Sequence, residues 1–368
     1  MDTFKKTFKN RKVLITGHTG FKGSWLAIWL KELGAQVIGY SLDPPTNPNN
    51  FELTRLSEKI TDIRGDIRNY QKLEETFQNY QPEIIFHLAA QAIVLTGFEN
   101  PKETFETNVH GTINILEVAK KTPSVKTVII VTSDKCYKDQ NVPGGYREND
   151  TLGGSDPYSA SKSMAELAVY SYQKSFYDPS KDIVVASVRA GNVIGGGDFA
   201  DFRLIPDSMK ALMGKTPIMI RNPDSVRPWQ HVLVPLSGYL ALAAKIQEKR
   251  HEYGGSWNFG PIEKMGITTK ELADKIVNLW EGSSWQHIKH ENNKKETMIL
   301  KLNWDKAAHF LNWAPAYNYE EALKSTVEWF KKYDQEKKNV DLYRLCVNQI
   351  IDYTERAQEQ KIQWALDN

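Results

Sequence analysis

Tyr158 and Lys162 form a Y-x-x-x-K spacing that could abstract a proton. On a helix, residues four apart share a face, so the ammonium of Lys162 can stand beside the phenol of Tyr158. A nearby cation favours the phenolate, whereas a free tyrosine, with a pKa of about 10, is a poor base at neutral pH. The spacing alone is common on amphipathic helices, so its meaning depends on what precedes it in the chain.

Ser133, Asp134 and Lys135 follow an apolar run, where polar side chains could face a ligand. In an open α/β sheet, ligands bind outside the carboxyl ends of the strands. Ser133 could bind a sugar hydroxyl together with Tyr158. Asp134 and Lys135 would be additional polar groups beside the same ligand. The alternative is that they form only a solvated strand end. Successive side chains on a regular strand point to opposite faces, so both can reach a ligand only if the chain leaves strand geometry there.

A glycine-rich turn near the start of the chain predicts a dinucleotide site. Gly17, Gly20 and Gly23 give G-x-x-G-x-x-G between an apolar run and a helical pattern, with Phe21 and Lys22 inside the turn. Glycine permits a tight turn and close backbone approach, and a helix N-terminus offers free N–H groups to a pyrophosphate. Three glycines are weak evidence alone, but a strand before them and a helix after them are the expected context.

The partner of the adenosine ribose is less clear. An acidic residue is expected about 20 residues after the glycine turn, at the end of the second strand. Ser41 lies 18 residues after Gly23, and Asp43 lies 20 after it. Either Asp43 serves or a hydroxyl holds the ribose. No arginine follows this strand where a 2′-phosphate would sit, so the expected cofactor is NAD.

The elements that must position these residues alternate along the first two thirds of the chain. Short apolar runs rich in Val and Ile predict buried strands at Lys12–Thr16, Gln36–Tyr40, Glu83–Leu88, Thr127–Thr132 and Ile183–Arg189. Helical patterns separate them, as at Gly20–Leu33. Near-continuous apolar strands between helices indicate a parallel sheet covered on both faces. We therefore predict a Rossmann-type, doubly wound α/β fold.

After Gly191 the pattern changes to loops and short elements, which suits a smaller substrate lobe. We expect residues 1–190 to form the cofactor domain, which carries the catalytic residues. Residues 191–368 are then mainly the sugar-nucleotide lobe, with some chain returning to the sheet. Trp257–Gly260 predicts one more strand and Thr268–Trp280 a helix, and the tail from Lys331 predicts one or two helices packed on the lobe.

Composition narrows the class of protein. The chain has 368 residues and a formal charge of +2, so nothing points to nucleic acid or to a charged membrane surface. The N-terminus lacks the apolar run of a signal peptide, and no stretch approaches the roughly 20 apolar residues of a membrane span. Cys136 and Cys346 make no disulfide framework. We expect a soluble cytoplasmic protein without a metal site.

Four linked segments resemble those of the nucleotide-sugar 4,6-dehydratases, a group of extended short-chain dehydrogenase/reductases. They are Gly17–Leu26 (GHTGFKGSWL), Ser133–Tyr137 (SDKCY), Arg189–Asp198 (RAGNVIGGGD) and Arg227–Val232 (RPWQHV). Members acting on dTDP-glucose and GDP-mannose typically carry Asp-Glu at the place of Asp134 and Lys135. Ser-Asp-Lys-Cys-Tyr is typical of members acting on CDP-glucose. Ser41 departs from the wider superfamily pattern.

The resemblance implies further site residues. The cofactor would contact Ser41, Tyr158 and Lys162, together with Asp66, Ile67, Leu88, Ala89 and Ala90, and Asn108 would be a structural asparagine of this site. The sugar nucleotide would contact Gln91, Asn192, Arg203 and Arg227, with Arg221 a weaker candidate. Arginine suits a diphosphate because its planar fork can bind phosphate oxygens with two hydrogen bonds.

The resemblance also implies a reaction. Tyr158 would take the 4-hydroxyl proton as hydride leaves C4, Asp134 would protonate the departing C6 hydroxyl, and Lys135 would be the C5 base. A coupled Asp134–Lys135 pair is the alternative base. The product would be a 4-keto-6-deoxy sugar nucleotide. A 4-epimerase and a non-catalytic dinucleotide-binding regulator remain rival interpretations. The helices Glu103–Lys120 and Ser159–Lys174 resemble a four-helix contact, which implies a homodimer or homotetramer.

Overall fold

The computed structural model describes residues 4–140, 142, 144–177, 182–263, 266–288, 300–336 and 340–366. Its centre is a seven-stranded parallel sheet in the order β11-β6-β5-β4-β1-β2-β3. The strands are β1 (Lys12–Thr16), β2 (Gln36–Ser41), β3 (Thr61–Arg64), β4 (Ile84–His87), β5 (Thr127–Val131), β6 (Val184–Arg189) and β11 (Gly255–Asn258). The predicted Rossmann-type fold is confirmed.

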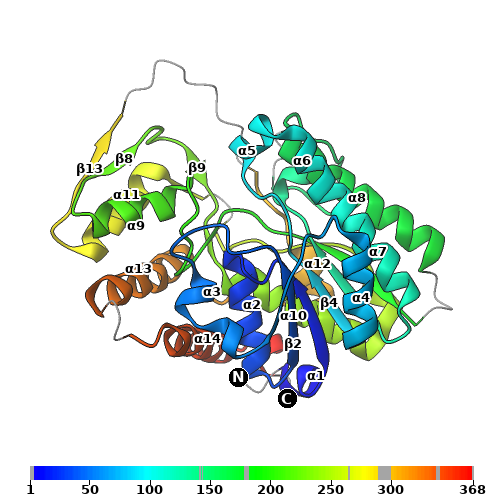
Figure 1. The fold of residues 1–368 in the computed structure, drawn as a ribbon. Helices are drawn as coiled ribbons and strands as arrows, with labels where there is room; N and C mark the ends of the chain where they lie inside the picture. Colours follow the sequence, from blue (N-terminus) through cyan, green and yellow to red (C-terminus); the bar gives the residue numbers. More distant parts are fainter. Residues whose placement is uncertain are drawn as a thin grey trace.

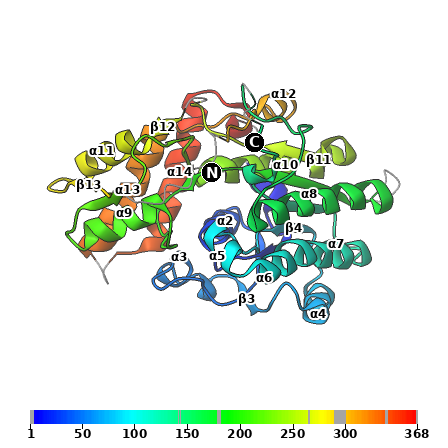
Figure 2. The same cartoon turned by 90° about the horizontal axis from the view of Figure 1, so that it is seen from above.

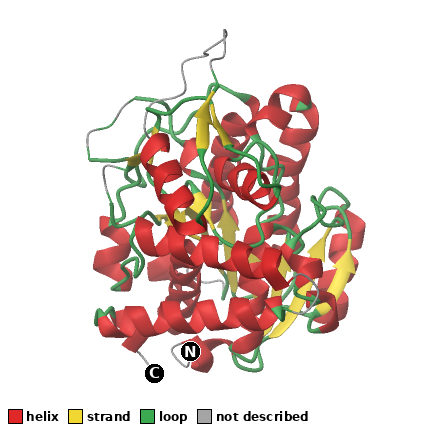
Figure 3. Ribbon diagram, turned by 90° about the vertical axis from the view of Figure 1, so that its left-hand side faces the viewer, coloured by secondary structure: helices red, strands yellow, loops and turns green. Residues whose placement is uncertain are grey.

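Helices cover both faces of this sheet, because successive apolar residues of each strand point to opposite sides. In β1, Val13 and Ile15 enter the core shared with α2 (Phe21–Glu32), α10 (Leu233–Lys249) and α14 (Leu342–Glu359), and Leu14 enters the core on the other face. That second face is covered by α4 (Tyr70–Tyr80), α7 (Gly111–Lys121) and α8 (Pro157–Phe176). Figure 3 shows the strands enclosed by these helices.

A second group of elements stands beside the carboxyl ends of the strands (Figures 1 and 2). It holds α9 (Leu204–Met213), α11 (Thr269–Trp280) and α13 (Tyr319–Glu336). Three two-stranded pairs join it: β7 (Val193–Ile194) with β10 (Gln230–His231), β9 (Val226–Arg227) with β12 (Ile267–Thr268), and β8 (Ile218–Ile220) with β13 (Trp285–His287). All of these elements lie within residues 191–368.

Shorter elements complete the chain. They are α1 (Lys5–Phe8), α3 (Asn50–Leu53), η2 (Leu56–Glu58), α5 (Val94–Glu99), α6 (Pro101–Phe105), η3 (Glu106–His110), η4 (Asp134–Cys136), η5 (Arg250–Tyr253), α12 (Asp305–Leu311) and α15 (Gln363–Leu366). No helix in the described ranges is long and apolar enough to cross a bilayer.

Three sequence predictions differ from the structure. The last strand, β11, begins at Gly255, two residues before the predicted start at Trp257. The strand β3 was not predicted, because only Ile63 in it is apolar and it lies at the sheet edge, where polar strands are normal. The tail helix α14 packs on α2 of the sheet layer, where Tyr343 donates to Glu32 at 2.6 Å, as well as on α13.

Candidate active site

The glycine turn after β1 forms a cradle that fits a dinucleotide pyrophosphate. Gly17 has a φ of +77°, and a Cβ there would lie 2.7 Å from the Ala89 nitrogen. A Cβ on Gly23 would overlap the Gly17 carbonyl. Gly20 begins α2 without a side-chain cap, so the first N–H groups of the helix remain for an anion. These glycines leave backbone exposed where larger residues would fill the space.

The predicted wall of the cradle is built around Asn108. Its amide exchanges two hydrogen bonds with the Gln91 backbone, at 2.8 and 3.0 Å, and donates to the Ser161 hydroxyl of α8 at 2.9 Å. Asn108 lies in the π-helical segment η3, a form often found at functional sites. Asn108 therefore joins the loop after β4 to α8. The Gln91 side chain donates to the Thr104 hydroxyl of α6 and accepts from the Ile93 nitrogen of its own loop.

At the end of β2, the Ser41 hydroxyl is 2.8 Å from the Thr19 hydroxyl of the glycine turn. The Asp43 side chain is 92% exposed, which leaves Ser41 as the group facing the turn. Arg64 of β3 pairs in register with Ser41 and donates to the Leu42 carbonyl at 3.1 Å. Sequence reasoning missed this arginine because it arrives from the neighbouring strand. Its charge is balanced by Asp62, at 2.9 Å.

Asp66 and Ile67, which are expected to contact the cofactor, lie two and three residues after the end of β3. Asp66 is paired with Arg68 at 2.6 Å, and the Arg68 hydrogen bonds lower the pKa of the Asp66 carboxyl. Ile67 is buried, and a Cβ on Gly111 would lie 2.7 Å from its side chain. The carboxylate of Asp66 is therefore engaged locally, whereas its carbonyl accepts from Tyr40 at 2.9 Å.

The polar segment after β5 leaves strand geometry at once. Ser133 caps the short 3₁₀ helix η4, with its hydroxyl accepting from the Lys135 nitrogen at 3.2 Å and donating to Asp134 Oδ1 at 2.9 Å. Asp134 is buried, and burial raises the pKa of its carboxyl against the opposing charges of Lys135 and Lys22. Both Asp134 and Lys135 could reach one ligand only if the chain left strand geometry here, and the turn meets this condition.

Tyr158 and Lys162 lie one turn apart on α8, which begins with Pro157 and is capped by Asp156. Ser133 acts on the phenol of Tyr158. Burial nevertheless raises the pKa of the Tyr158 phenol to about 12. Desolvation therefore outweighs the lowering of this pKa that was expected from a nearby cation. Burial likewise lowers the pKa of Lys162 to about 8, and its ammonium lies 3.5 Å from the Val131 carbonyl.

Lys22 reaches from the glycine turn into the same space. Burial lowers the pKa of its ammonium to about 8, with the charges of Arg203 and Lys162 acting in the same direction and Asp134 opposing them. Its nitrogen is 5.8 Å from the centre of the Tyr239 ring. The Lys22 side chain therefore faces both the cradle and the polar segment after β5. Its place in the glycine turn predicted only the first of these contacts.

The predicted substrate residues separate into near and distant groups. Arg203 is half-buried, pairs with Asp198 at 3.0 Å, and its charge acts on Tyr158. Asn192, with a φ of +42°, lies three residues after the end of β6, and its carbonyl accepts from the Gln230 nitrogen at 3.2 Å. Arg227 is half-buried in β9. Arg221 is exposed on the lobe, where its charge acts on Asp207, so nothing places it beside Tyr158.

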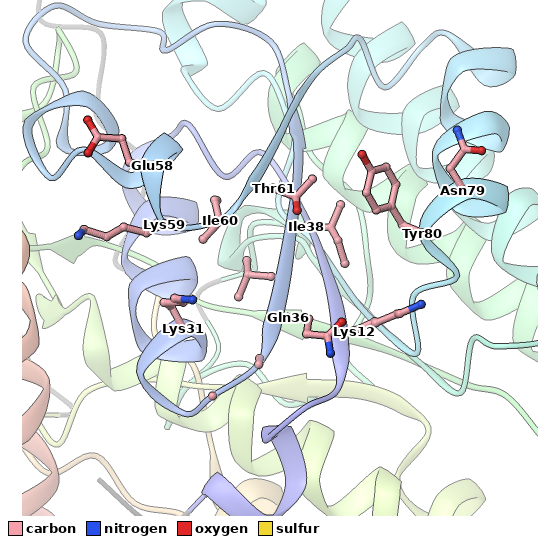
Figure 4. Close-up of a pocket in the computed structure, with 13 residues that line it drawn as sticks. Lys12, Lys31, Gln36, Ile38, Glu58, Lys59, Ile60, Thr61, Asn79 and Tyr80 are labelled. Carbon is pink, nitrogen blue, oxygen red and sulfur yellow. The ribbon is translucent and has the colours of Figure 1, made fainter.

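The amino-terminal edge of the sheet carries a separate open cavity of about 530 Å³ (Figure 4). Lys12, Gln36 and Thr61, the first residues of β1, β2 and β3, line it together with Lys31 and Tyr80. No acid–base constellation like that after β5 faces it. Ligands of such sheets bind at the opposite edge, so the reactive groups define the candidate site. Within the described residues, no group of three His, Cys, Asp or Glu side chains could hold a metal ion.

The chain is similar to several known proteins. The family described as GDP-mannose 4,6 dehydratase matches residues 14–326. The CDP-glucose 4,6-dehydratase of Salmonella typhimurium is 45% identical over 332 residues, 89% of this chain and 92% of that protein. An epimerase structure from Methanothermobacter thermautotrophicus superposes with a TM-score of 0.76 at 24% identity, covering 90% of this chain and 95% of its own. The dTDP-glucose 4,6-dehydratase structure from Bacillus anthracis, in complex with NAD, gives 0.72 at 23% identity, with 88% and 97% covered.

Proposed function

Because the chain belongs to the GDP-mannose 4,6-dehydratase family, we propose that it is an NAD-dependent CDP-glucose 4,6-dehydratase. The reaction converts CDP-glucose to CDP-4-dehydro-6-deoxyglucose with loss of water and no net redox change. The observation that carries the proposal is the pair Asp134 and Lys135, in a turn next to Ser133 and Tyr158. A 4-epimerase would leave Asp134 and Lys135 without a chemical role. A dinucleotide sensor would need neither these two residues nor Ser133 and Tyr158.

The cradle residues would hold NAD, with Gly17, Gly20 and the first turn of α2 at the pyrophosphate. Phe21, Lys22, Gly23, Leu88, Ala89 and Ala90 complete its walls, and the Ser41 hydroxyl faces the ribose. When bound, NAD supplies the acceptor for the hydride of C4 and the donor of the hydride to C6.

Tyr158 starts the reaction by accepting the proton of the sugar 4-hydroxyl, with Ser133 as the second hydrogen-bond partner of that oxygen. Burial raises the pKa of the Tyr158 phenol, and Ser133 acts in the opposite direction, toward the phenolate that the step needs. Lys162, one turn along α8, supplies a positive charge on the same helix face. The resulting 4-ketone acidifies the C5 proton.

Asp134 then acts as the acid that protonates the leaving C6 hydroxyl. Burial raises the pKa of its carboxyl, which is the direction an acid requires. Lys135, alone or coupled with Asp134 through water, is the candidate base that removes the C5 proton, and a proton must return to C5 when hydride reaches C6. Arg203 and Arg227 would bind the diphosphate of the sugar nucleotide, with Asn192 nearby and Arg221 as a further candidate.

The test is product analysis with purified protein, NAD and CDP-glucose. A 4-keto-6-deoxy product gives a characteristic absorbance in alkali, and the assay is repeated with UDP-, dTDP- and GDP-linked sugars. Turnover highest with CDP-glucose is expected. Higher turnover with another nucleotide sugar would contradict CDP-glucose as the substrate. A 4-epimer formed without loss of water would contradict the dehydratase reaction.

Assembly, location and domain division complete the proposal. Met164, Leu167 and Tyr170 are exposed on α8, and Leu95 and Phe98 are exposed on α5. Exposed apolar side chains on α8 suit a contact with a second copy. We therefore infer a homodimer or homotetramer built on α8 and on the helices within Glu103–Lys120, whose sequence resembles such a contact. We place the enzyme in the cytoplasm. We assign cofactor binding and catalysis to residues 1–190, and sugar-nucleotide binding mainly to residues 191–368.

A further inference from the structure

Both residues that flank the turn Ser133–Cys136 are tied to one buried ion pair. Glu166 of α8 and Arg189 of β6 lie 2.7 Å apart, with side chains only 1% and 2% exposed. We propose that this pair, acting through Thr132 and Tyr137, positions the turn against α8, so that Asp134 and Lys135 meet the substrate that Tyr158 holds. The inference rests on the proposed function and assigns Tyr137, Glu166 and Arg189 as positioning residues.

The first attachment precedes the turn. The Thr132 hydroxyl donates to Glu166 Oε1, and the Thr132 nitrogen donates to the Val188 carbonyl of β6 at 2.9 Å. The other Glu166 oxygen accepts from Arg189 and from two hydroxyls, of Ser187 at 2.7 Å and Ser256 at 3.2 Å. Both carboxylate oxygens are therefore engaged, so Thr132 is attached to an anchor that has little freedom to move.

The second attachment follows the turn. The Tyr137 hydroxyl accepts from Arg189 Nη1 at 2.6 Å and donates to Asn258 Oδ1 at 2.8 Å. Its ring stacks on Tyr146, with centroids 4.8 Å apart, and the Arg189 guanidinium lies 4.8 Å from the ring centre. Burial raises the pKa of the Tyr137 phenol, which keeps its proton for Asn258. Two partners and a stacked ring thus fix the position of Tyr137.

The same ion pair also borders the catalytic helix. Glu166 lies four residues after Lys162, on the same face of α8. Burial lowers the pKa of Lys162, and the Glu166 carboxylate opposes that shift. Ser163 of α8 adds a direct link, donating to the Cys136 carbonyl at 2.8 Å. A buried ion pair contributes little net stability compared with an apolar pair, so its geometric role explains these contacts better than a stabilising role.

Tyr137→Phe tests the positioning role, with Tyr146→Phe as its matched control. Each variant loses one phenol hydroxyl from the same buried, stacked pair, but the Tyr146 oxygen accepts from the Gln140 nitrogen at 2.9 Å and is bonded to neither Glu166 nor Arg189. Misplacing reactive groups by about 1 Å can cost 10²-fold in rate. We expect Tyr137→Phe to lower kcat by roughly 10- to 100-fold, with KM for CDP-glucose and NAD affinity unchanged. Tyr146→Phe should keep its kcat.

Amide hydrogen exchange supplies a readout that needs no substrate. The turn is held by hydrogen bonds from the nitrogens of Lys135, Cys136 and Tyr137. Tyr137→Phe and Thr132→Val should each speed exchange at these amides, and Tyr146→Phe should not. If wild type turns over none of the nucleotide sugars, the proposed function fails while this readout still decides the positioning role. Unchanged exchange and kcat in Tyr137→Phe, or equal losses in both tyrosine variants, would overturn it.

Discussion

Asp134 and Lys135 are adjacent in the chain but should act at different atoms of the sugar. We predict that Asp134→Asn and Lys135→Met each block elimination and still permit oxidation at C4, because Ser133, Tyr158 and Lys162 remain. A general acid or base typically contributes about 10²–10⁴-fold, so turnover should fall within that range. Absorbance of reduced nicotinamide on the enzyme would report the surviving first step.

Solvent deuterium separates the two roles. Lys135→Met should lose exchange at C5, and Asp134→Asn should keep that exchange and release little water. Tyr158→Phe is the control, since it should abolish both steps and leave NAD binding intact. Full turnover by Lys135→Met would remove this lysine from the mechanism and weaken the choice of CDP-glucose as substrate.

The ribose end of the cradle makes a second prediction at the residue scale. Arg64 faces Ser41, but Asp62 balances its charge, so a 2′-phosphate would gain no free cation there. NAD should therefore bind more tightly than NADP, by roughly tenfold or more, as expected when a charge-assisted bond is missing. Calorimetry with both nucleotides measures the difference, and tighter binding of NADP would contradict the assignment.

Sequence reasoning located the residues of the candidate site better than it located their partners. The glycine turn and the Tyr158–Lys162 spacing follow from local rules, because a turn or one helix fixes them. Arg64 and the pair of Glu166 and Arg189 were missed, because their partners come from other strands and only the folded sheet brings them together. The pKa of Tyr158 depends on burial, which local spacing does not determine.

At the scale of elements, the chain leaving β6 is pressed against the turn after β5. A Cβ on Gly191 would overlap the Asp134 carboxyl, so even alanine must displace that group. We predict that Gly191→Ala keeps the fold and NAD affinity and loses on the order of 10²-fold in kcat. Gly254→Ala is the matched control, because a Cβ there meets nothing nearer than 3.6 Å. Equal kcat in the two variants would show that Asp134 tolerates displacement.

Strands of the sheet interior were predictable, whereas the edge strand β3 was not. The predicted runs match β1, β2, β4, β5 and β6 within about a residue or two, because strands buried on both faces are almost wholly apolar. At the sheet edge β3 needs little apolar character, and its four residues carry Thr61, Asp62 and Arg64. Docking of α14 on α2 depends on long-range packing, which periodicity does not determine.

At the scale of the whole molecule, the exposed residues Met164, Leu167 and Tyr170 of α8 predict self-association. Met164→Glu combined with Leu167→Glu should yield a monomer by light scattering at micromolar concentration, because burying two carboxylates in an apolar contact is unfavourable. Leu366→Glu places one such charge at another exposed apolar position and should leave the assembly unchanged. A wild-type monomer would refute the proposed contact.

The edge strand β11 pairs with β6 but begins 66 residues after β6 ends, because the first part of the lobe lies between them in the sequence. During synthesis, the outer edge of β6 therefore stays open until the ribosome has released Asn258. A gene fragment stopping near residue 190 would produce a sheet with that edge unpaired, a template for aggregation. Exchange of lobes between relatives would have to retain β11 and α10 with the first half, because both pack on its sheet.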